Sequence, residues 1–386
     1  MKLAGPADGT APHRRILFIV VALILYGSLY PWHFQVRHFG ASPLWILLHR
    51  WPGSLDRYVL WDVAVNVFLY LPLGIFGFLA LSGKASRVVR IGVPLLLALV
   101  LSSSIEMLQL YDDSRMCSLS DVASNVAGAV IGIAAGALYN GTLQRLVSAH
   151  PAADLLRPSG ALLLLSCWLG YEIFPLFPAW GRTSLFRRIA ALEHATSVSP
   201  VETVLVFAEW LAVACLLDSV LKSKARWFLT AALFLLPVRL LIASRTLAWP
   251  DIAGAVAAYA VWMWAPRAYV RKAAPYALAG AVILGELAPF HFTGARTFNW
   301  VPFRGFFRAD WQNGFVLLFR KSFWYGSVLW LWRAAGHKLL WTTAIAAGTL
   351  FLTERLEVYL PGRTPEITDA VLAILMGVLL WLLRDA

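Results

Sequence analysis

The sequence predicts an all-α, polytopic membrane protein with about twelve transmembrane helices, arranged as three parallel repeats of four helices. Of its 386 residues, 60% are apolar and only 14% are charged, which is far from the balance of a soluble domain. Apolar stretches of roughly 17 to 22 residues recur along the chain, and each is long enough for one helix to cross the hydrocarbon layer. Polar residues also recur at a fixed spacing at the ends of these stretches.

The helices follow from the apolar stretches in chain order. We expect them at residues 14–30, 62–82, 89–110, 120–139, 160–176, 202–221, 227–243, 250–266, 273–290, 314–332, 339–358 and 367–383. Grouped in fours, they form repeats at residues 1–150, 151–268 and 269–386. Because four is an even number, the repeats share one orientation and are related by an axis along the membrane normal.

The first helix of each repeat ends in a motif of proline and aromatic residues. The motif reads Tyr30-Pro31-Trp32-His33-Phe34, then Phe174-Pro175-Leu176-Phe177, then Ala288-Pro289-Phe290-His291-Phe292. His33 and His291 are candidate proton donors or acceptors near neutral pH. The alternative is an interfacial aromatic belt in which the histidines are incidental.

The second helices differ between the repeats. In the first repeat Asp62 and Asn66 begin this helix, and Asn125 adds an amide on the fourth helix. In the third repeat the corresponding region carries Arg320 and Lys321, cations that attract phosphate or carboxylate groups. The first and third repeats therefore cannot contain identical sites.

Acids and an arginine join the third helix to the fourth at a spacing of nine and fifteen residues. The residues are Glu106, Arg115 and Asp121 in the first repeat and Glu354, Arg363 and Asp369 in the third, whereas the middle repeat has Leu236, Arg245 and Asp251. Gln109 and Glu357 lie on the same helix faces as the glutamates. An ionised carboxylate at the bilayer centre costs about 2.5 kcal/mol or more, so these acids should face the bundle and have a partner. The alternative is a glutamate at a helix end that contacts head groups and water.

The arginines and aspartates have structural explanations. An arginine can fork between the glutamate and the aspartate and clasp the two helices together, a role that competes with ligand binding. The aspartates also stand where helices start, and an acid there stabilises exposed N–H groups. Arg and Asp persist in the middle repeat, whereas the glutamate and the histidine are absent from it. We therefore interpret Arg and Asp as architectural, and glutamate and histidine as the better candidates for function.

Charge and cysteine content exclude several classes of protein. The net charge of +12 comes from Lys and Arg scattered through short connections, which is typical of membrane-protein loops rather than of a nucleic-acid surface. Cys117, Cys167 and Cys215 lack metal-ligand spacing, so we expect no disulfide framework, no metal site and no cofactor. Arg14 and Arg15 precede an apolar run without a small-residue cleavage site, which indicates an uncleaved first helix.

The polar pattern of the first repeat resembles the VanZ-like family of membrane proteins, named for an accessory determinant of teicoplanin resistance. The resemblance covers residues 14–140 and rests on Asp62, Asn66, Pro72, Gly74, Ser102, Glu106, Gln109, Arg115, Asp121, Asn125 and Gly128. Residues 273–383 are similar through His291, Glu354, Arg363 and Asp369. The resemblance implies a four-helix membrane domain with a role at the cell envelope and an association with antibiotic resistance.

Short basic connections suggest the orientation. Lys84, Arg87, Arg90, Lys222, Lys224, Arg226, Arg267, Arg271 and Lys272 fall on the side of both termini. We therefore expect cytoplasmic termini in a multi-pass protein of the inner (plasma) membrane. The repeated polar motifs then face outward.

Three functions are compatible with these patterns. The first is binding of a polar lipid, a lipid-linked envelope precursor or a glycopeptide-like ligand, with membrane lipid as partner and no nucleic acid. The second is an intramembrane enzyme that acts on an envelope lipid or glycan through His33 with Glu106 or His291 with Glu354, without a recognised catalytic motif. The third is a transporter. The candidate ligand-binding residues are His33, Asp62, Asn66, Glu106, Gln109, Arg115, Asp121, Asn125, His291, Glu354, Glu357, Arg363 and Asp369.

Overall fold

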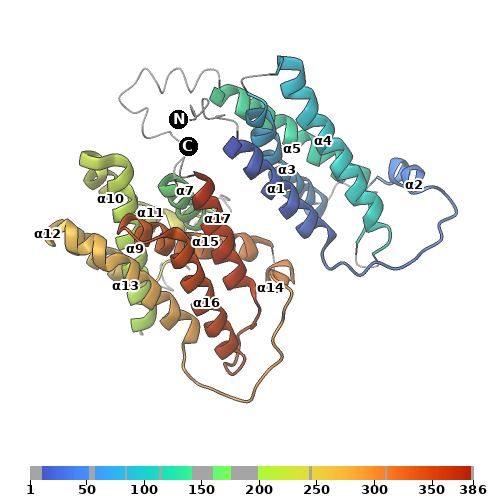
Figure 1. Ribbon diagram of the computed structural model, residues 1–386. Helices are drawn as coiled ribbons and strands as arrows, with labels where there is room; N and C mark the ends of the chain where they lie inside the picture. The colour runs from blue at the N-terminus through green and yellow to red at the C-terminus, as the bar shows by residue number, and fades with distance from the viewer. Residues whose placement is uncertain are drawn as a thin grey trace, which may run out of the picture. The chain divides into compact units, whose positions relative to one another are not determined.

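The computed structural model describes residues 11–51, 57–82, 85–112, 115–140, 160–174, 199–242, 246–308 and 311–383. The chain divides into two compact units, unit 1 at Met1–Leu156 and unit 2 at Arg157–Arg384. Apart from two isolated β-bridges, the regular structure of the described residues is helical, so the protein is all-α as predicted (Figure 1). The two units are described separately below.

The described part of unit 1 contains four long helices and one short one. They are α1 (Ala11–Leu29), α2 (Pro43–His49), α3 (Arg57–Ala80), α4 (Arg87–Gln109) and α5 (Leu119–Leu138). The four long helices correspond to the first four predicted spans, and α2 lies in the loop after the first. Tyr70, Leu73 and Ala98 are completely buried where α3 and α4 pack together.

Glycines bring α3 and α5 into close contact. A Cβ atom at Gly74 would collide with the carbonyl oxygen of Ala129, and one at Gly128 would collide with that of Val67. Gly132 has the same relation to the carbonyl oxygen of Leu71. Gly128 and Gly132 of α5 therefore pack directly against α3, which is the use that small residues have at membrane helix interfaces.

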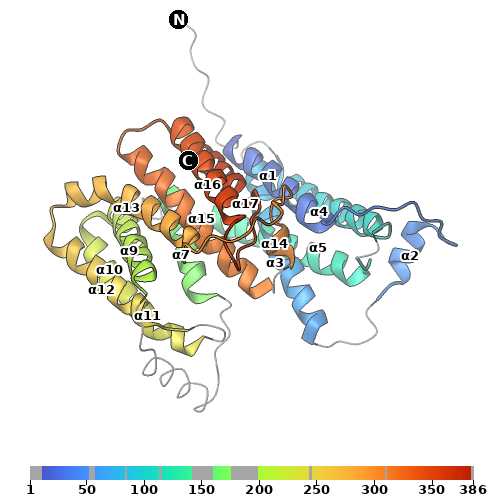
Figure 2. The same cartoon turned by 90° about the horizontal axis from the view of Figure 1, so that it is seen from below.

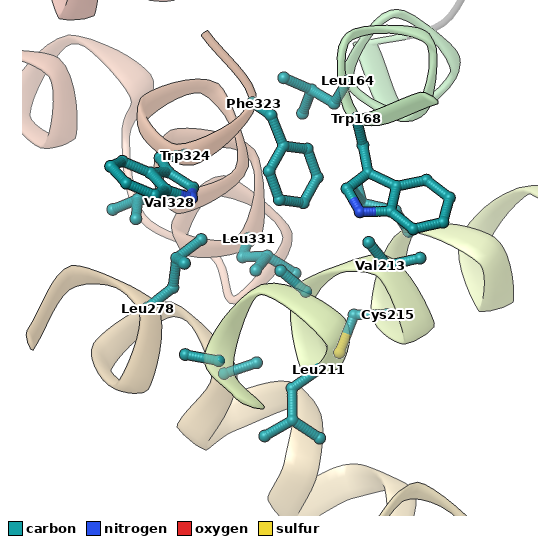
Figure 3. Packing of buried hydrophobic residues seen from close by; sticks show 14 of the residues in the cluster. Leu164, Trp168, Leu211, Val213, Cys215, Leu278, Phe323, Trp324, Val328 and Leu331 are labelled. Carbon is teal, nitrogen blue, oxygen red and sulfur yellow. The ribbon is translucent and has the colours of Figure 1, made fainter. Parts of the chain in front are cut away.

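Unit 2 contains the remaining helices. They are α7 (Gly160–Ile173), α9 (Pro200–Leu221), α10 (Ala225–Leu233), α11 (Leu235–Val238), α12 (Trp249–Trp264), α13 (Arg267–Leu287), α14 (Arg304–Arg308), α15 (Trp311–Ala334), α16 (Leu339–Glu357) and α17 (Thr368–Leu382). The helix α9 packs against both α12 and α13, and α16 packs against α17 (Figure 2). Figure 3 shows part of the core, to which Trp168 of α7, Phe323 of α15 and Leu278 of α13 all contribute.

The predicted seventh helix is broken. In place of one helix over 227–243, the described residues form α10, then the short α11, then a 3-10 turn at Arg239–Leu241. Pro237 explains the break, because proline has no N–H and its ring would clash with the carbonyl of Leu233, where α10 ends. The apolar pattern alone did not reveal this interruption.

The outer faces of the helices are apolar. Five described helices are long and apolar enough to cross a membrane: Pro12–Leu29, Asp62–Ala80, Arg87–Gln109, Leu119–Leu138 and Pro200–Leu221. Large apolar side chains on their outer faces are uncovered by protein, including Phe18 at 75% exposure and Val88 at 80%. Such surfaces suit contact with lipid rather than water. These helices indicate a multi-pass membrane protein, although five such helices are found among the described residues and not the twelve predicted.

Candidate functional site

In unit 1 Glu106 links the end of α4 to the turn before α5, and Arg115 links that turn to the end of α1. Glu106 is 3% exposed and accepts a hydrogen bond from the Ser118 N–H at 2.9 Å. Arg115 donates to the carbonyl oxygen of Tyr30 through two nitrogens at 2.8 and 2.6 Å and to that of Gly27 at 3.4 Å. Arg115 therefore satisfies the carbonyls that a helix leaves unpaired at its C-terminus, here that of α1. Among these described residues it makes no ion pair with Glu106 or Asp121, so the expected arginine fork is not formed.

Other predicted residues of unit 1 also make hydrogen bonds within the bundle. Gln109 donates to the carbonyl oxygen of Ser28 at 2.7 Å, and Asn125 donates to the Ser102 hydroxyl at 2.9 Å. The carboxylate of Asp121 has Asn66 as a hydrogen-bond partner. Asp62 lies close enough to Asp121 to act on it electrostatically. The structure thus brings together the predicted acids and amides of the first repeat.

The two histidines lie apart from these clusters. His33 is exposed, and its main-chain N–H donates to the Asp112 carboxylate at 3.1 Å. His291 is also exposed. Neither imidazole hydrogen-bonds within the described part of the chain, so neither forms the expected pair with Glu106 or Glu354.

Cys117 lies beside the Glu106 cluster, in the turn between α4 and α5. It is 3% exposed. Burial, followed by the nearby negative charge of Glu106, raises the pKa of the Cys117 thiol to about 11. The thiol is therefore protonated at neutral pH and is a poor nucleophile.

Unit 2 repeats the contacts of Glu106 and Arg115 at its C-terminal end. Glu354 is 3% exposed and accepts from the N–H groups of Glu366 at 2.8 Å and Asp369 at 3.3 Å. Arg363 donates to the carbonyl oxygens of Gly285 at 2.6 Å and Ala288 at 2.9 Å, at the end of α13. Both arginines therefore cap the first helix of their bundle, and both glutamates fix the turn that precedes the last helix.

Lys321 is the centre of a charged network in unit 2. Its ammonium group contacts both carboxylate oxygens of Asp369, at 2.8 and 2.6 Å, and lies 3.3 Å from Glu286. Glu286 is also 3.7 Å from Arg363 and has Glu357 as a hydrogen-bond partner. Sequence reasoning did not include Glu286. A usable signal was present, because Glu172 and Glu286 each precede the proline of a first-helix exit by three residues.

A cavity of about 740 Å³ opens onto this network. Its walls come from the start of α9, the end of α13, α15, the end of α16 and the start of α17. The charged residues of its lining are Glu202, Glu286, Arg320, Lys321, Glu354, Glu357, Arg363, Glu366 and Asp369. Four predicted residues, Glu354, Glu357, Arg363 and Asp369, therefore share one cavity, and His291 is absent from its lining.

The middle of the chain has a buried ion cluster of its own. Arg239 is 6% exposed and contacts both carboxylate oxygens of Glu172, at 2.5 and 2.7 Å. It also lies 3.0 Å from Asp251. Asp251 accepts from the Ala248 N–H at 2.9 Å, which is the helix-start contact expected of this acid. Arg245, the predicted partner of Asp251, lies outside the described residues.

Arg320 of α15 contacts residues of both α7 and α9. Its guanidinium lies over the ring of Trp324 at 4.3 Å and near that of Tyr171 at 5.2 Å. Its Nε is 3.6 Å from Glu209, a 3% exposed acid that accepts a hydrogen bond from the Trp324 indole. Glu209 was not among the residues predicted from the sequence. An acid in the middle of an apolar span is nevertheless a signal of a functional or paired residue.

Fold and contacts together define a helical membrane domain in which a buried glutamate links the last two helices and an arginine from the turn between them caps the first helix. Comparison with known families agrees for the first part of the chain: residues 16–140 match the VanZ/LLP1 family. The first third is therefore a VanZ/LLP1 family domain, as the sequence pattern indicated. The match does not extend to the weaker copy predicted in the last third. Neither the comparison with curated proteins nor that with solved structures found a match.

Proposed function

We propose that this envelope membrane protein binds the polar head of a lipid or lipid-linked envelope precursor in the cavity of unit 2. The carrying observation is the cavity itself, about 740 Å³ in volume and lined by buried charged groups at the ends of membrane helices. Its volume lies within the range of roughly 300 to 1,000 Å³ that is usual for small-molecule sites. Buried charges at such a position are costly and tend to mark functional sites.

The last four-helix bundle of unit 2 and the bundle of unit 1 share the same contacts, which supports their origin from one kind of repeat. Glu106 and Glu354 accept from the main chain twelve residues further on, and Arg115 and Arg363 cap the preceding first helix. Since these contacts are shared, they account for the architecture. Ligand specificity then belongs to positions at which the two bundles differ, such as Gln109 and Glu357.

The proposed topology follows the predicted repeats. Twelve spans with cytoplasmic termini place the cavity on the outer side of the inner membrane, where the head group of an outer-leaflet amphiphile can enter. The apolar outer faces of the helices would accommodate its acyl or prenyl chain. The enzyme hypothesis receives no support from the exposed, separate positions of His33 and His291. A transporter would use the same cavity as its outward-open site.

Lipid analysis of the purified full-length protein tests this proposal. We expect one lipid class to be enriched over the bulk membrane and to be lost in Leu317→Trp, which fills the cavity from its exposed wall. Leu340→Trp is the matched control, because Leu340 is 77% exposed on α16 and absent from the lining. Equal lipid content in both variants would contradict the proposal, as would cavity-dependent binding of added teicoplanin without any lipid.

A further inference from the structure

Arg320 differs from the other cations of the unit 2 cavity in its hydrogen bonding. Lys321 is held by Asp369 and Glu286 at 3.3 Å or less, and Arg363 by two carbonyl oxygens. By contrast, the Arg320 guanidinium makes no hydrogen bond among the described residues. Its Nε is buried 3.6 Å from a carboxylate oxygen of Glu209, so the donors left for a ligand are those of its terminal nitrogens. The Arg320 side chain is 29% exposed and belongs to the cavity wall.

Neighbouring aromatic rings hold the Arg320 guanidinium in place. Trp324 lies under it, and the ring of Tyr171 is 5.2 Å away. The Trp324 indole also donates to Glu209, which orients the acid beside the guanidinium. A planar guanidinium with unused donors matches the paired oxygens of a phosphate group. This end of the cavity is therefore suited to an anion.

The other end of the cavity has an excess of negative charge. Glu286, Glu354, Glu357, Glu366 and Asp369 contribute five carboxyl groups there, against the two cations Lys321 and Arg363. The carboxyl groups of Glu286 and Glu357 are hydrogen-bond partners. Two carboxylates in contact repel each other unless a proton or another cation lies between them. A protonated amine can supply that cation and donate to both groups.

Unit 1 shows that the positions of Glu286 and Glu357 do not need charged residues for the helices to pack. Gln109 occupies the position that corresponds to Glu357, and Ser28 the position that corresponds to Glu286. The Gln109 amide donates to the Ser28 carbonyl oxygen at 2.7 Å. Neutral residues therefore stand at both equivalent positions of unit 1, with Gln109 bonded to the main chain, so the acids of unit 2 call for an explanation other than packing.

We propose that the cavity of unit 2 takes a zwitterionic amine–phosphate group of the phosphoethanolamine class, with phosphate at Arg320 and the amine at Glu286 and Glu357. This assignment rests on the proposed function and names the head group. Arg320 and Glu286 both line this one cavity, so a single ligand within it can contact both groups. A phospholipid head group and a soluble phosphate ester offer the same chemistry, and the experiment separates them.

Binding of defined probes to the detergent-purified full-length protein tests the assignment. Phosphoethanolamine should bind roughly tenfold more tightly than phosphocholine, whose quaternary ammonium donates no hydrogen bond, and than inorganic phosphate. Nanodiscs of phosphatidylethanolamine and of phosphatidylcholine supply the lipid arm. Preference for phosphatidylethanolamine assigns the site to the lipid head group, whereas preference confined to the soluble probe assigns the same chemistry to a free ester.

Two variants locate the two ends of the ligand. Glu357→Gln introduces the residue that unit 1 has and should abolish the preference for the amine while leaving phosphate affinity unchanged. Arg320→Gln should weaken phosphoethanolamine and phosphate alike by roughly tenfold, with partial rescue by Arg320→Lys. An unchanged preference in Glu357→Gln would overturn the assignment. Cavity-dependent binding of a different amphiphile would also overturn it but leave the proposed function standing, whereas the absence of any cavity-bound amphiphile would remove both.

Discussion

Glu106 and Glu354 are buried acids whose carboxylates accept hydrogen bonds from main-chain N–H groups after the turn that follows their helix. A carboxylate that accepts such bonds is partly compensated for its removal from water. The same two residues were predicted as functional because they are absent from the middle repeat. Their contacts are also those of structural residues, and under the proposed function the ligand-specific positions would lie next to them, at Glu357 and Glu286.

The arginines allow a direct test at this scale. Arg115→Gln should lower the free energy of unfolding by about 2 kcal/mol, because carbonyl oxygens at the end of α1 lose a charged donor. Arg363→Gln should cost a similar amount at the end of α13. Thermal unfolding in detergent measures both losses.

Arg296→Gln serves as the control for these variants. The Arg296 side chain is exposed, so its replacement should change stability by less than about 0.5 kcal/mol. If Arg115→Gln and Arg296→Gln unfolded at the same temperature, the helix-capping role of Arg115 would be wrong.

Among the helices, the contact of α3 with α5 depends on glycine. Gly128→Ala and Gly132→Ala should each destabilise unit 1 by about 1 to 3 kcal/mol, because the added Cβ meets a main-chain oxygen that cannot move aside. Gly92→Ala and Gly280→Ala are matched controls in α4 and α13, where open space surrounds the Cα. Since alanine favours a helix over glycine, these controls should be neutral or stabilising. Equal losses at all four positions would contradict the close-packing explanation.

Helix positions could be predicted from the sequence much better than the partners of polar residues. Apolar runs located the long helices, since a membrane span needs a fixed length of apolar sequence. The break after Leu233 escaped prediction although Pro237 stood in the run. The contacts of Lys321 with Asp369 and Glu286 join three helices, and neither helix period nor spacing along the chain specifies such contacts.

At the scale of the whole molecule, the broken segment at α10 and α11 determines the topology. With twelve spans, the loop after the first helix and the loop after α13 both lie outside. If α10 and α11 do not cross the membrane, every later segment is inverted. Val36 is 92% exposed in the first loop, and Gly294 is exposed in the second, with open space around it. Cysteines at these two positions therefore distinguish the alternatives.

Labelling of intact cells with a membrane-impermeant maleimide makes the comparison, in a background that lacks the native cysteines. We expect Val36→Cys and Gly294→Cys to react from outside, and Lys272→Cys and Lys338→Cys to react only after permeabilisation, because short basic connections stay in the cytoplasm. Labelling of Val36→Cys but not Gly294→Cys would show that α10 and α11 do not cross. The cavity would then open toward the cytoplasm, and its amphiphile would have to come from the inner leaflet. If Lys272→Cys and Lys338→Cys reacted in intact cells and neither loop cysteine did, the whole protein would have the opposite orientation to the one proposed.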